Sequence, residues 1–206
     1  MLMIRHCFTN WCSTNHLVLN VSKTKEMVID YSKTQNHELL YINDDNVEVV
    51  TSYKYLGVTI DDKFSFNIHT DRLHKKCNQR LYFVRKLSRL HVDNSVMKLF
   101  YISVLQSVIS FAICCWFGNS AARFTCKIER TIKVCQKLGI DVVYMEKLYK
   151  NAVEQRCKMI RKDESHPLHD KYQPLPSGRR LRSIKARTSR YSKSFVPSSI
   201  KLLNLN

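Results

Sequence analysis

The sequence predicts an α+β protein, with a small antiparallel β unit followed by a mostly α-helical bundle and an extended basic C-terminal tail. Three observations lead to this prediction. Short β-branched and aromatic stretches fill the first third, an apolar repeat of three and four residues begins at Asn67, and all four prolines lie at or after Pro167. With 206 residues, 44% of them hydrophobic, the chain is long enough to build a core.

The first third is typical of short strands. Residues 27–29, 38–42, 47–50 and 53–60 are rich in β-branched and aromatic side chains, and Asn and Asp separate some of them. A small number of short strands is not stable alone. We therefore expect these strands to pack on another part of the chain. Ahead of them, residues 12–19 resemble the end of a helix.

Four amphipathic helices are expected next. The first begins at Asn67, with a basic outer face and an inner face made of Leu73, Cys77, Leu81, Val84 and Leu87. Asp93 or Asn94 should cap the second. Its apolar positions are Val96, Leu99, Phe100, Val104, Val108 and Phe111.

The third helix runs from about Ala121 to Gly139, a natural C-terminal cap, and the fourth covers residues 142–161. The tail from His166 contains the prolines and has no acidic residue after Asp170. We expect an extended arm that is ordered only where Phe195, Val196 and Ile200 dock.

The charge balance points to an anionic partner. Lys and Arg number 34 against 17 Asp and Glu, which leaves a formal net charge of +17. Nucleic acids and acidic membranes are the common partners of so basic a chain. The longest apolar run, residues 108–117, is about half of a membrane span. We therefore expect RNA or DNA as the partner and no membrane.

The eight cysteines indicate a reduced core rather than a metal site. None forms a CxxC pair, and residues 1–10 lack the apolar segment of a secretory signal. Zinc sites need paired ligand spacing. Cys114, Cys115, Cys126 and Cys135 lack it, as does the His166 and His169 pair. We expect no metal and no cofactor.

Several motifs occur in an order that is specific to one family. They are WC (11–12) with NHLVLN (15–20), KTKEM (23–27), YKYLGVTID (53–61), KK (75–76) with QRLY (79–82), WFGN (116–119), HPLH (166–169) and LPSGRR (175–180). Together they resemble the C-terminal region of LINE-type (non-LTR) retrotransposon reverse transcriptases, and they span nearly the whole chain.

The resemblance implies three regions: a late-palm and primer-grip-like β unit (1–66), a thumb-like helical region (67–162) and a basic extended tail (163–206). It implies that Lys23 or Lys25 lies near a leaving pyrophosphate, where an ammonium stabilises developing charge. It also places Tyr55, Leu56 and Gly57 in a primer-grip hairpin. The alternatives from the residues alone are a solvated strand edge for the lysines and a bend or bulge at Gly57.

The resemblance does not imply a working polymerase. Its catalytic aspartates would lie before residue 1, and they bind two magnesium ions. Asp61-Asp62 follows the primer-grip stretch and Asp44-Asp45 is typical of a turn, so neither pair is a replacement. We expect no enzyme activity from these residues.

The region that resembles reverse transcriptases also resembles the domain named after the N-terminal region of the eighth AlkB homologue. That name suggests a 2-oxoglutarate-dependent dioxygenase or a methyltransferase. His69-Thr70-Asp71 matches the HxD pair of the dioxygenase iron site, but it opens a basic helix, where Thr70 or Asp71 would serve as the cap. Four scattered glycines do not form the glycine-rich turn of a methyltransferase.

Non-specific nucleic-acid binding is the function that these features favour. Phosphate contacts are expected from Lys75, Lys76 and Arg80 and from Arg179, Arg180 and Arg182. Tyr82, Phe83 and Tyr191 are candidates for stacking on bases, with one of Tyr82 and Phe83 buried. The alternatives are a relic whose palm-facing surface binds another protein, and an incomplete gene model of a full reverse transcriptase. The expected location is intracellular, in the nucleus or cytoplasm.

Overall fold

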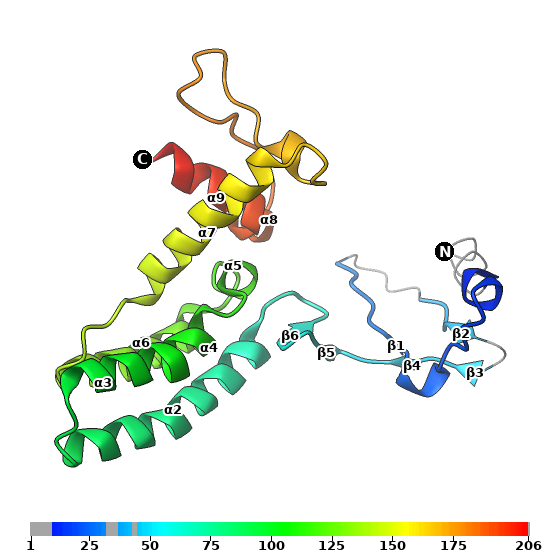
Figure 1. Ribbon diagram of the computed structural model, residues 1–206. Coiled ribbons are helices and arrows are strands. Elements are labelled where there is room, and N and C mark those ends of the chain that lie inside the picture. Colours follow the sequence, from blue (N-terminus) through cyan, green and yellow to red (C-terminus); the bar gives the residue numbers. More distant parts are fainter. Residues whose placement is uncertain (1–9, 32–36, 43–44, 206) are drawn as a thin grey trace. The chain divides into compact units, whose positions relative to one another are not determined.

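Short strands precede a set of helices, and the predicted α+β class is confirmed (Figure 1). The computed structural model describes residues 10–31, 37–42 and 45–205. They form two units. The first comprises Met1–Leu56 with Asp61–Lys63, and the second comprises Gly57–Ile60 with Phe64–Asn206. Among the described residues, no helix is long and apolar enough to cross a membrane.

The strands occur in three separate pairs. The parallel pair joins β1 (Lys25–Glu26) and β4 (Glu48–Val49), which differs from the expected antiparallel arrangement. An antiparallel pair joins β2 (Tyr41–Ile42) and β3 (Asp45–Asn46). The third pair joins β5 (Ser52–Tyr55) and β6 (Val58–Asp61). Four of the strands are only two residues long, so an alternating pattern could not place their ends.

Some N-terminal expectations need correction. Residues 27–29 form no strand, and the strand begins two residues earlier. The stretch 53–60 is not one strand, because Leu56 and Gly57 turn the chain with φ of 44° and 91°. Two consecutive positive φ angles are typical of the type I′ turn that joins hairpin strands. The first helix ends at Thr14 rather than near Leu19, and the 3-10 helix η1 (Val21–Lys23) follows.

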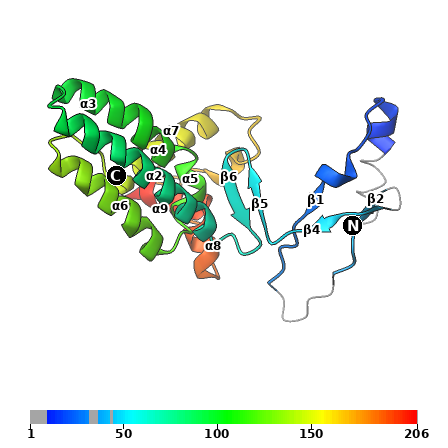
Figure 2. The same ribbon diagram turned by 90° about the horizontal axis from the view of Figure 1, so that it is seen from below.

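The helices begin close to their predicted positions. They are α2 (Asn67–Arg89), α3 (Asn94–Phe100), the π-helix η2 (Tyr101–Gln106), α4 (Ser107–Ser110), α5 (Ile113–Trp116), α6 (Ala122–Lys137) and α7 (Met145–Lys162). Asp93 caps α3 as predicted, because its side chain accepts a hydrogen bond from Ser95 N. Figure 2 shows α2 alongside α6 and α3.

The N-terminus of α2 differs from the prediction. The cap position is Phe66 rather than Thr70 or Asp71, and it makes no side-chain cap bond. Thr70 instead donates to Phe66 O at 2.6 Å and lies 2.8 Å from the hydroxyl of Ser120. The threonine therefore ties the first turn of α2 to the segment before α6.

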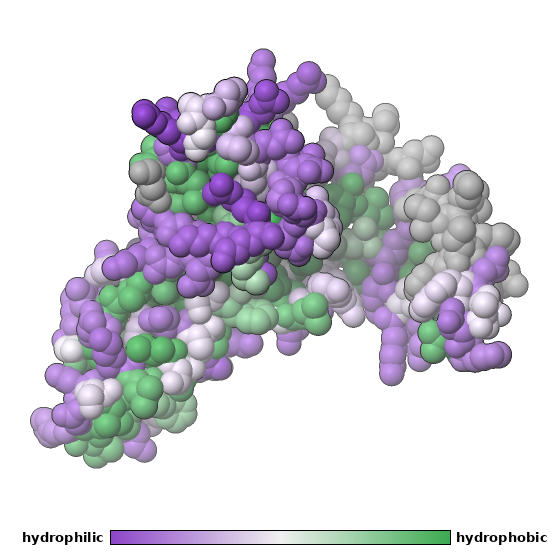
Figure 3. Space-filling model, turned by 45° about the horizontal axis from the view of Figure 1, so that its top comes forward, coloured by the Kyte–Doolittle hydropathy of each residue, from purple (hydrophilic) through white to green (hydrophobic). Residues whose placement is uncertain are grey.

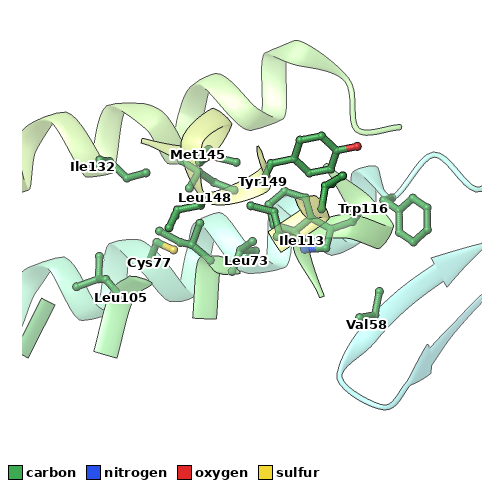
Figure 4. Packing of buried hydrophobic residues seen from close by; sticks show 14 of the residues in the cluster. Val58, Leu73, Cys77, Leu105, Ile113, Trp116, Ile132, Met145, Leu148 and Tyr149 are labelled. Carbon is green, nitrogen blue, oxygen red and sulfur yellow. The ribbon is translucent and has the colours of Figure 1, made fainter. Parts of the chain in front are cut away.

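The core lies between α2 and the later helices. The predicted inner face of α2 is confirmed, since Leu73, Cys77, Leu81 and Val84 are buried and Leu87 is half-buried. Figure 4 shows Leu73 and Cys77 facing side chains of the later helices. The largest fully buried side chain is Trp116, which packs on the ring of His69 at 5.7 Å between centroids.

The second predicted helix buries a different face from the one expected. Val96, Leu99 and Phe111 are exposed, and Phe100, Val104 and Val108 are only half-buried. The buried residues are Met97, Tyr101, Leu105 and Ile109, which recur every four residues. The difference already begins in α3, where Met97 is buried and Val96 and Leu99 are exposed, and the π-helix that follows continues the four-residue spacing.

The tail is more structured than an extended arm. It contains a 3-10 turn, η3 (His169–Lys171), and two helices, α8 (Ser189–Lys193) and α9 (Phe195–Asn204). The expected docking is confirmed, because Ile200 is buried and Phe195 and Val196 are half-buried against the core. Tyr172 and Leu181 are also buried, and they anchor the residues between η3 and α8.

Substitution of Gly118, where the helices meet the tail, should destabilise the protein. A Cβ at this glycine would lie 2.7 Å from the carbonyl oxygen of Lys193. Because backbone atoms cannot yield as a flexible side chain does, Gly118→Ala should lower the free energy of unfolding by about 1–3 kcal/mol. Urea unfolding should show a lower midpoint, whereas the neighbouring Asn119→Ala should change it little. Equal midpoints for the two variants would show that the tail does not pack this closely.

Candidate nucleic-acid interface

The predicted interface residues lie in separate places. Lys23 and Lys25 belong to the first unit, whereas the α2 residues and the three tail arginines belong to the second. Within the second unit, α2 and the loop between η3 and α8 lie at opposite ends (Figure 1). The structure therefore contains two basic surfaces in the second unit rather than one continuous patch.

Lys25 has a structural partner. Its ammonium forms an ion pair with Glu48, the residue opposite it in the parallel β1–β4 pair. Lys23 is exposed at the end of η1. The ion pair joins the two strands, so Lys25 is less available to a phosphate than a free lysine.

The turn at residues 55–57 exposes its side chains. Tyr55 is 58% exposed and Leu56 78% exposed. Leu56 has a left-handed φ of 44°, which is strained for a branched side chain. A Cβ on Gly57 would lie 3.1 Å from the Phe111 ring, so the chain's own aromatic side chain occupies the space beside this glycine.

The outer face of α2 combines lysines with aromatic rings. Lys75, Gln79, Tyr82 and Lys86 follow an i, i+4, i+7, i+11 spacing, which places them on one side of a helix. All four are exposed, as are Lys76 and Phe83 beside them. We call these six residues the α2 outer face.

Charge on α2 is almost entirely positive. The helix contains seven Lys and Arg residues and a single acid, Asp71. Asp71 lies 3.0 Å from Lys75 Nζ, and this hydrogen bond lowers the pKa of the carboxyl group. Because the Lys75 side chain is 72% exposed, the pair is screened by water, and we expect it to exchange readily for a phosphate contact.

Both aromatic side chains of the pair at 82 and 83 are exposed, so the prediction that one is buried is wrong. Tyr82 is 61% and Phe83 53% exposed, and their rings meet edge to face at 5.5 Å between centroids. The buried stripe passes through Leu81 and Val84, on the other side of the helix. Two exposed rings in contact offer an apolar surface among lysines.

Arg80 has an internal hydrogen-bond partner, which its prediction as a phosphate contact did not include. It is half-buried, and its guanidinium donates to the carbonyl oxygen of Val104 in the π-helix η2. A π-helical turn changes the pairing of backbone carbonyls, so a side-chain donor from α2 is well placed there. The sequence could not show this, because it gave no sign of the π-helix.

The three tail arginines lie on a small hairpin. Pro174 and Leu181 form an antiparallel bridge, and Leu175 N donates to Arg180 O at 2.7 Å. Gly178 has φ of 69°, the left-handed geometry that the turn needs. Arg179, Arg180 and Arg182 are exposed around it. We call residues 173–182 the arginine hairpin.

The acidic pairs serve local structure. Asp61 is buried, and its side chain accepts from Lys63 N at 3.0 Å. Asp62 N donates to Thr51 O at 3.0 Å. Asp45 pairs with Ile42 in the β2–β3 ladder, and Asp44 lies outside the described residues.

The HxD residues point in different directions. Residues two apart on a helix are separated by about 200°, so His69 and Asp71 do not face one ligand. His69 Nδ1 instead accepts from Thr59 N at 3.3 Å, and Asp71 pairs with Lys75. Burial, followed by the charges of Lys76 and Arg72, lowers the pKa of His69 to about 4.

The thiols and the tail histidines form packing and hydrogen-bond contacts. Cys12, Cys77, Cys135 and Cys157 are buried, and the described cysteines are unpaired. Burial raises the pKa of Cys77 to about 12 and of Cys135 to about 11. His166 Nδ1 accepts from Leu168 N, and His169 Nδ1 lies 3.2 Å from Ile160 O. In the described ranges, no three His, Cys, Asp or Glu residues are grouped as metal ligands.

The contacts predicted from the sequence did not include Lys86, Gln79 or Lys201. Lys86 and Gln79 follow Lys75 at helical spacing, so counting along the α2 face would have added them. Lys201 has no such signal. It is brought beside the arginine hairpin by the docking of α9, because Lys201 and Arg180 line the same pocket.

The comparisons with known proteins match one part of the chain. The family model described as "Alkylated DNA repair protein alkB homolog 8, N-terminal" matches residues 66–107. This stretch runs from the cap of α2 to the first residue of α4, and it supports the resemblance to that domain. No curated protein and no solved structure matches the chain. The resemblance to reverse transcriptases therefore stays a prediction.

His69 should make stability depend on pH. Its pKa is about 4 in the folded chain, against an ordinary value of 6.5, so the unfolded chain takes up a proton first as pH falls. Stability should therefore decrease as pH drops from about 6.5 towards 4, because protonation also removes the acceptor for Thr59 N. Urea midpoints across this range should show the loss, and His69→Asn should flatten it. The control is His91→Asn, at an exposed position, which should keep the wild-type dependence of the urea midpoint on pH. If His69→Asn keeps that dependence as well, His69 does not have this role.

Proposed function

We propose that this chain binds RNA or DNA without sequence specificity, as a segment derived from a LINE-type reverse transcriptase and without polymerase activity of its own. The observation that supports this best is the α2 outer face, where Lys75, Lys76 and Lys86 surround the exposed rings of Tyr82 and Phe83. Lysines neutralise phosphates, and aromatic faces stack on any base.

The geometry of this face suits a nucleic-acid strand. Lys75 and Lys86 lie eleven residues apart, which corresponds to about 16 Å along the helix axis. A strand crossing this face would meet cations at both ends and rings between them. No base-reading groove or motif is evident in the sequence, so the affinity should come from phosphates and stacking rather than from base identity.

The order of elements supports the reverse-transcriptase origin. A Tyr-Leu-Gly hairpin turn precedes a basic amphipathic helix and further helices, as the resemblance implies for a primer grip followed by a thumb. The HPLH motif closes the end of α7, and the LPSGRR motif forms the arginine hairpin. These motifs occupy local structures that explain their composition.

The absence of enzyme activity is part of the proposal. The Asp61 carboxylate accepts a hydrogen bond from Lys63 N, whereas Asp62 bonds Thr51 and Asp45 pairs with Ile42 through the backbone. His69 accepts a backbone hydrogen bond and packs on Trp116. The Asp61 carboxylate and the His69 ring therefore already have structural contacts that metal binding would disrupt.

The family-model match favours a second candidate. It covers residues 66–107, about a fifth of the chain, and its description names an alkylated DNA repair protein. An N-terminal module of such a protein would be consistent with nucleic-acid binding. In that case α2 and η2 would form the shared unit, and binding would not require the arginine hairpin.

The phosphate contacts predict a change in salt dependence. The variant Lys75→Gln/Lys76→Gln/Lys86→Gln should reduce the slope of log affinity against log salt by about 2–3, because each lost phosphate contact removes about 0.7–0.9. Fluorescence anisotropy with single-stranded RNA, single-stranded DNA and a primer–template duplex, across a salt series, measures this slope.

The matched control is Lys133→Gln/Lys137→Gln/Lys147→Gln, which removes the same charge from exposed lysines of α6 and α7. If both triple variants lower the slope equally, binding depends on total charge and the α2 outer face is not the interface. Tightest binding to the primer–template would favour the thumb-like origin.

Stacking predicts an effect that salt does not remove. Tyr82→Ala should weaken binding of single-stranded RNA or DNA by about tenfold, since a stacked base contributes about 1–3 kcal/mol. Tyr191→Ala tests the other aromatic candidate, which is exposed in α8. Fluorescence anisotropy at high salt separates stacking from phosphate contacts, because salt weakens only the phosphate contacts. A Tyr82→Ala chain that binds as tightly as wild type would exclude stacking at α2.

A further inference from the structure

A pocket of about 490 Å³ lies between the arginine hairpin and α9. This volume is within the range of about 300–1,000 Å³ that is usual for small-molecule sites. Its lining includes apolar side chains from the hairpin, from the loop that follows it and from α9. They are Leu175 and Leu181 of the hairpin, Ile184 and Ala186 of the following loop, and Pro197 and Ile200 of α9.

Charge at this pocket is of one sign. Arg180 and Lys201 line it, both are exposed, and no acidic residue is among the lining residues. The remaining polar groups are the hydroxyls of Ser183 and Ser192 and the amide of Asn204. An apolar interior with two cations suits a ligand that combines a flat apolar group with an anion.

The walls are held in place by polar contacts. Asn204 accepts from Leu181 N at 2.8 Å and donates to Leu181 O at 3.0 Å. Arg182 N donates to Gln173 O at 2.8 Å, and the hydroxyls of Tyr172 and Ser199 lie 2.8 Å apart. A wall that is already ordered loses little entropy when a ligand enters. In Figure 3, apolar surface lies among hydrophilic residues over the C-terminal part of the chain.

We propose that this pocket holds one unstacked nucleotide of a bound single strand, with its base against the apolar side chains and its phosphate between Arg180 and Lys201. This inference rests on the proposed function and adds a second contact site. Because Asn204 is already bonded to Leu181 through both polar atoms, the free side-chain groups facing a base are mainly the hydroxyls of Ser183 and Ser192, which can donate or accept. The pocket should therefore accept all four bases with similar affinity.

The test compares two strands of equal charge. One is a labelled oligothymidylate and the other is an abasic oligomer of the same length, which keeps every phosphate. Ser183→Trp fills the pocket mouth from an exposed position, and Ala186→Phe fills it from a half-buried one. Ser189→Trp is the control, since this exposed residue of α8 is outside the lining.

Both pocket variants should reduce the preference for the base-containing strand by about fivefold or more and leave the abasic affinity unchanged. The control should keep the wild-type preference. Arg180→Gln should weaken both strands more than Arg179→Gln, which lies on the same hairpin outside the pocket. A full preference in both pocket variants would overturn the pocket and leave the α2 interface intact.

A second measurement does not depend on strand binding. Thymidine 5′-monophosphate, titrated into methyl-labelled chain, should shift the resonance of Ile184 in wild type and not in Ser183→Trp. If neither strand binds at low salt and the nucleotide causes no shift, both the pocket and the proposed function are wrong. A saturable shift without strand binding would support the pocket and reject the proposed function.

Discussion

The burial of one face of α2 determines most of what this chain presents to solvent. Leu73, Cys77, Leu81 and Val84 are in the core, and each buried aliphatic side chain contributes about 1.5–3 kcal/mol. A helix cannot turn without exposing that stripe, so the opposite side has to face water. The lysines and rings of the α2 outer face are therefore exposed because the other side of the same helix is packed in the core.

Trp116 connects this helix to the rest of the second unit. Its indole N–H donates to Phe111 O at 3.0 Å, and its ring packs on His69 near the start of α2. Two residues later, Gly118 lets the carbonyl of Lys193 approach closely. A short segment thus links α2 with the tail through Trp116 and Gly118.

Polar pairs order the C-terminal part of the chain. A basic segment without acids repels itself, and it would be expected to stay extended. Here Tyr172 meets Ser199, and Asn204 bonds both polar backbone atoms of Leu181, so α9 holds the arginine hairpin. Once these contacts are satisfied, the arginines can lie together on the surface beside an apolar pocket. The positive charge of this segment is therefore held at one place on the surface, beside the pocket.

The sequence correctly predicts the α+β class, the starts of α2, α3 and α6, and the inner face of α2. These features follow from local periodicity and capping, which depend on neighbouring residues. Packing on α2 selects the buried face of the second helix, which begins with Met97 in α3 and continues through Tyr101 and Leu105 in the π-helix. The tertiary structure also decided that Arg80 bonds to Val104, that Phe83 is exposed beside Tyr82, and that Lys201 joins Arg180. Each of these depends on contacts between distant segments, which no local pattern records.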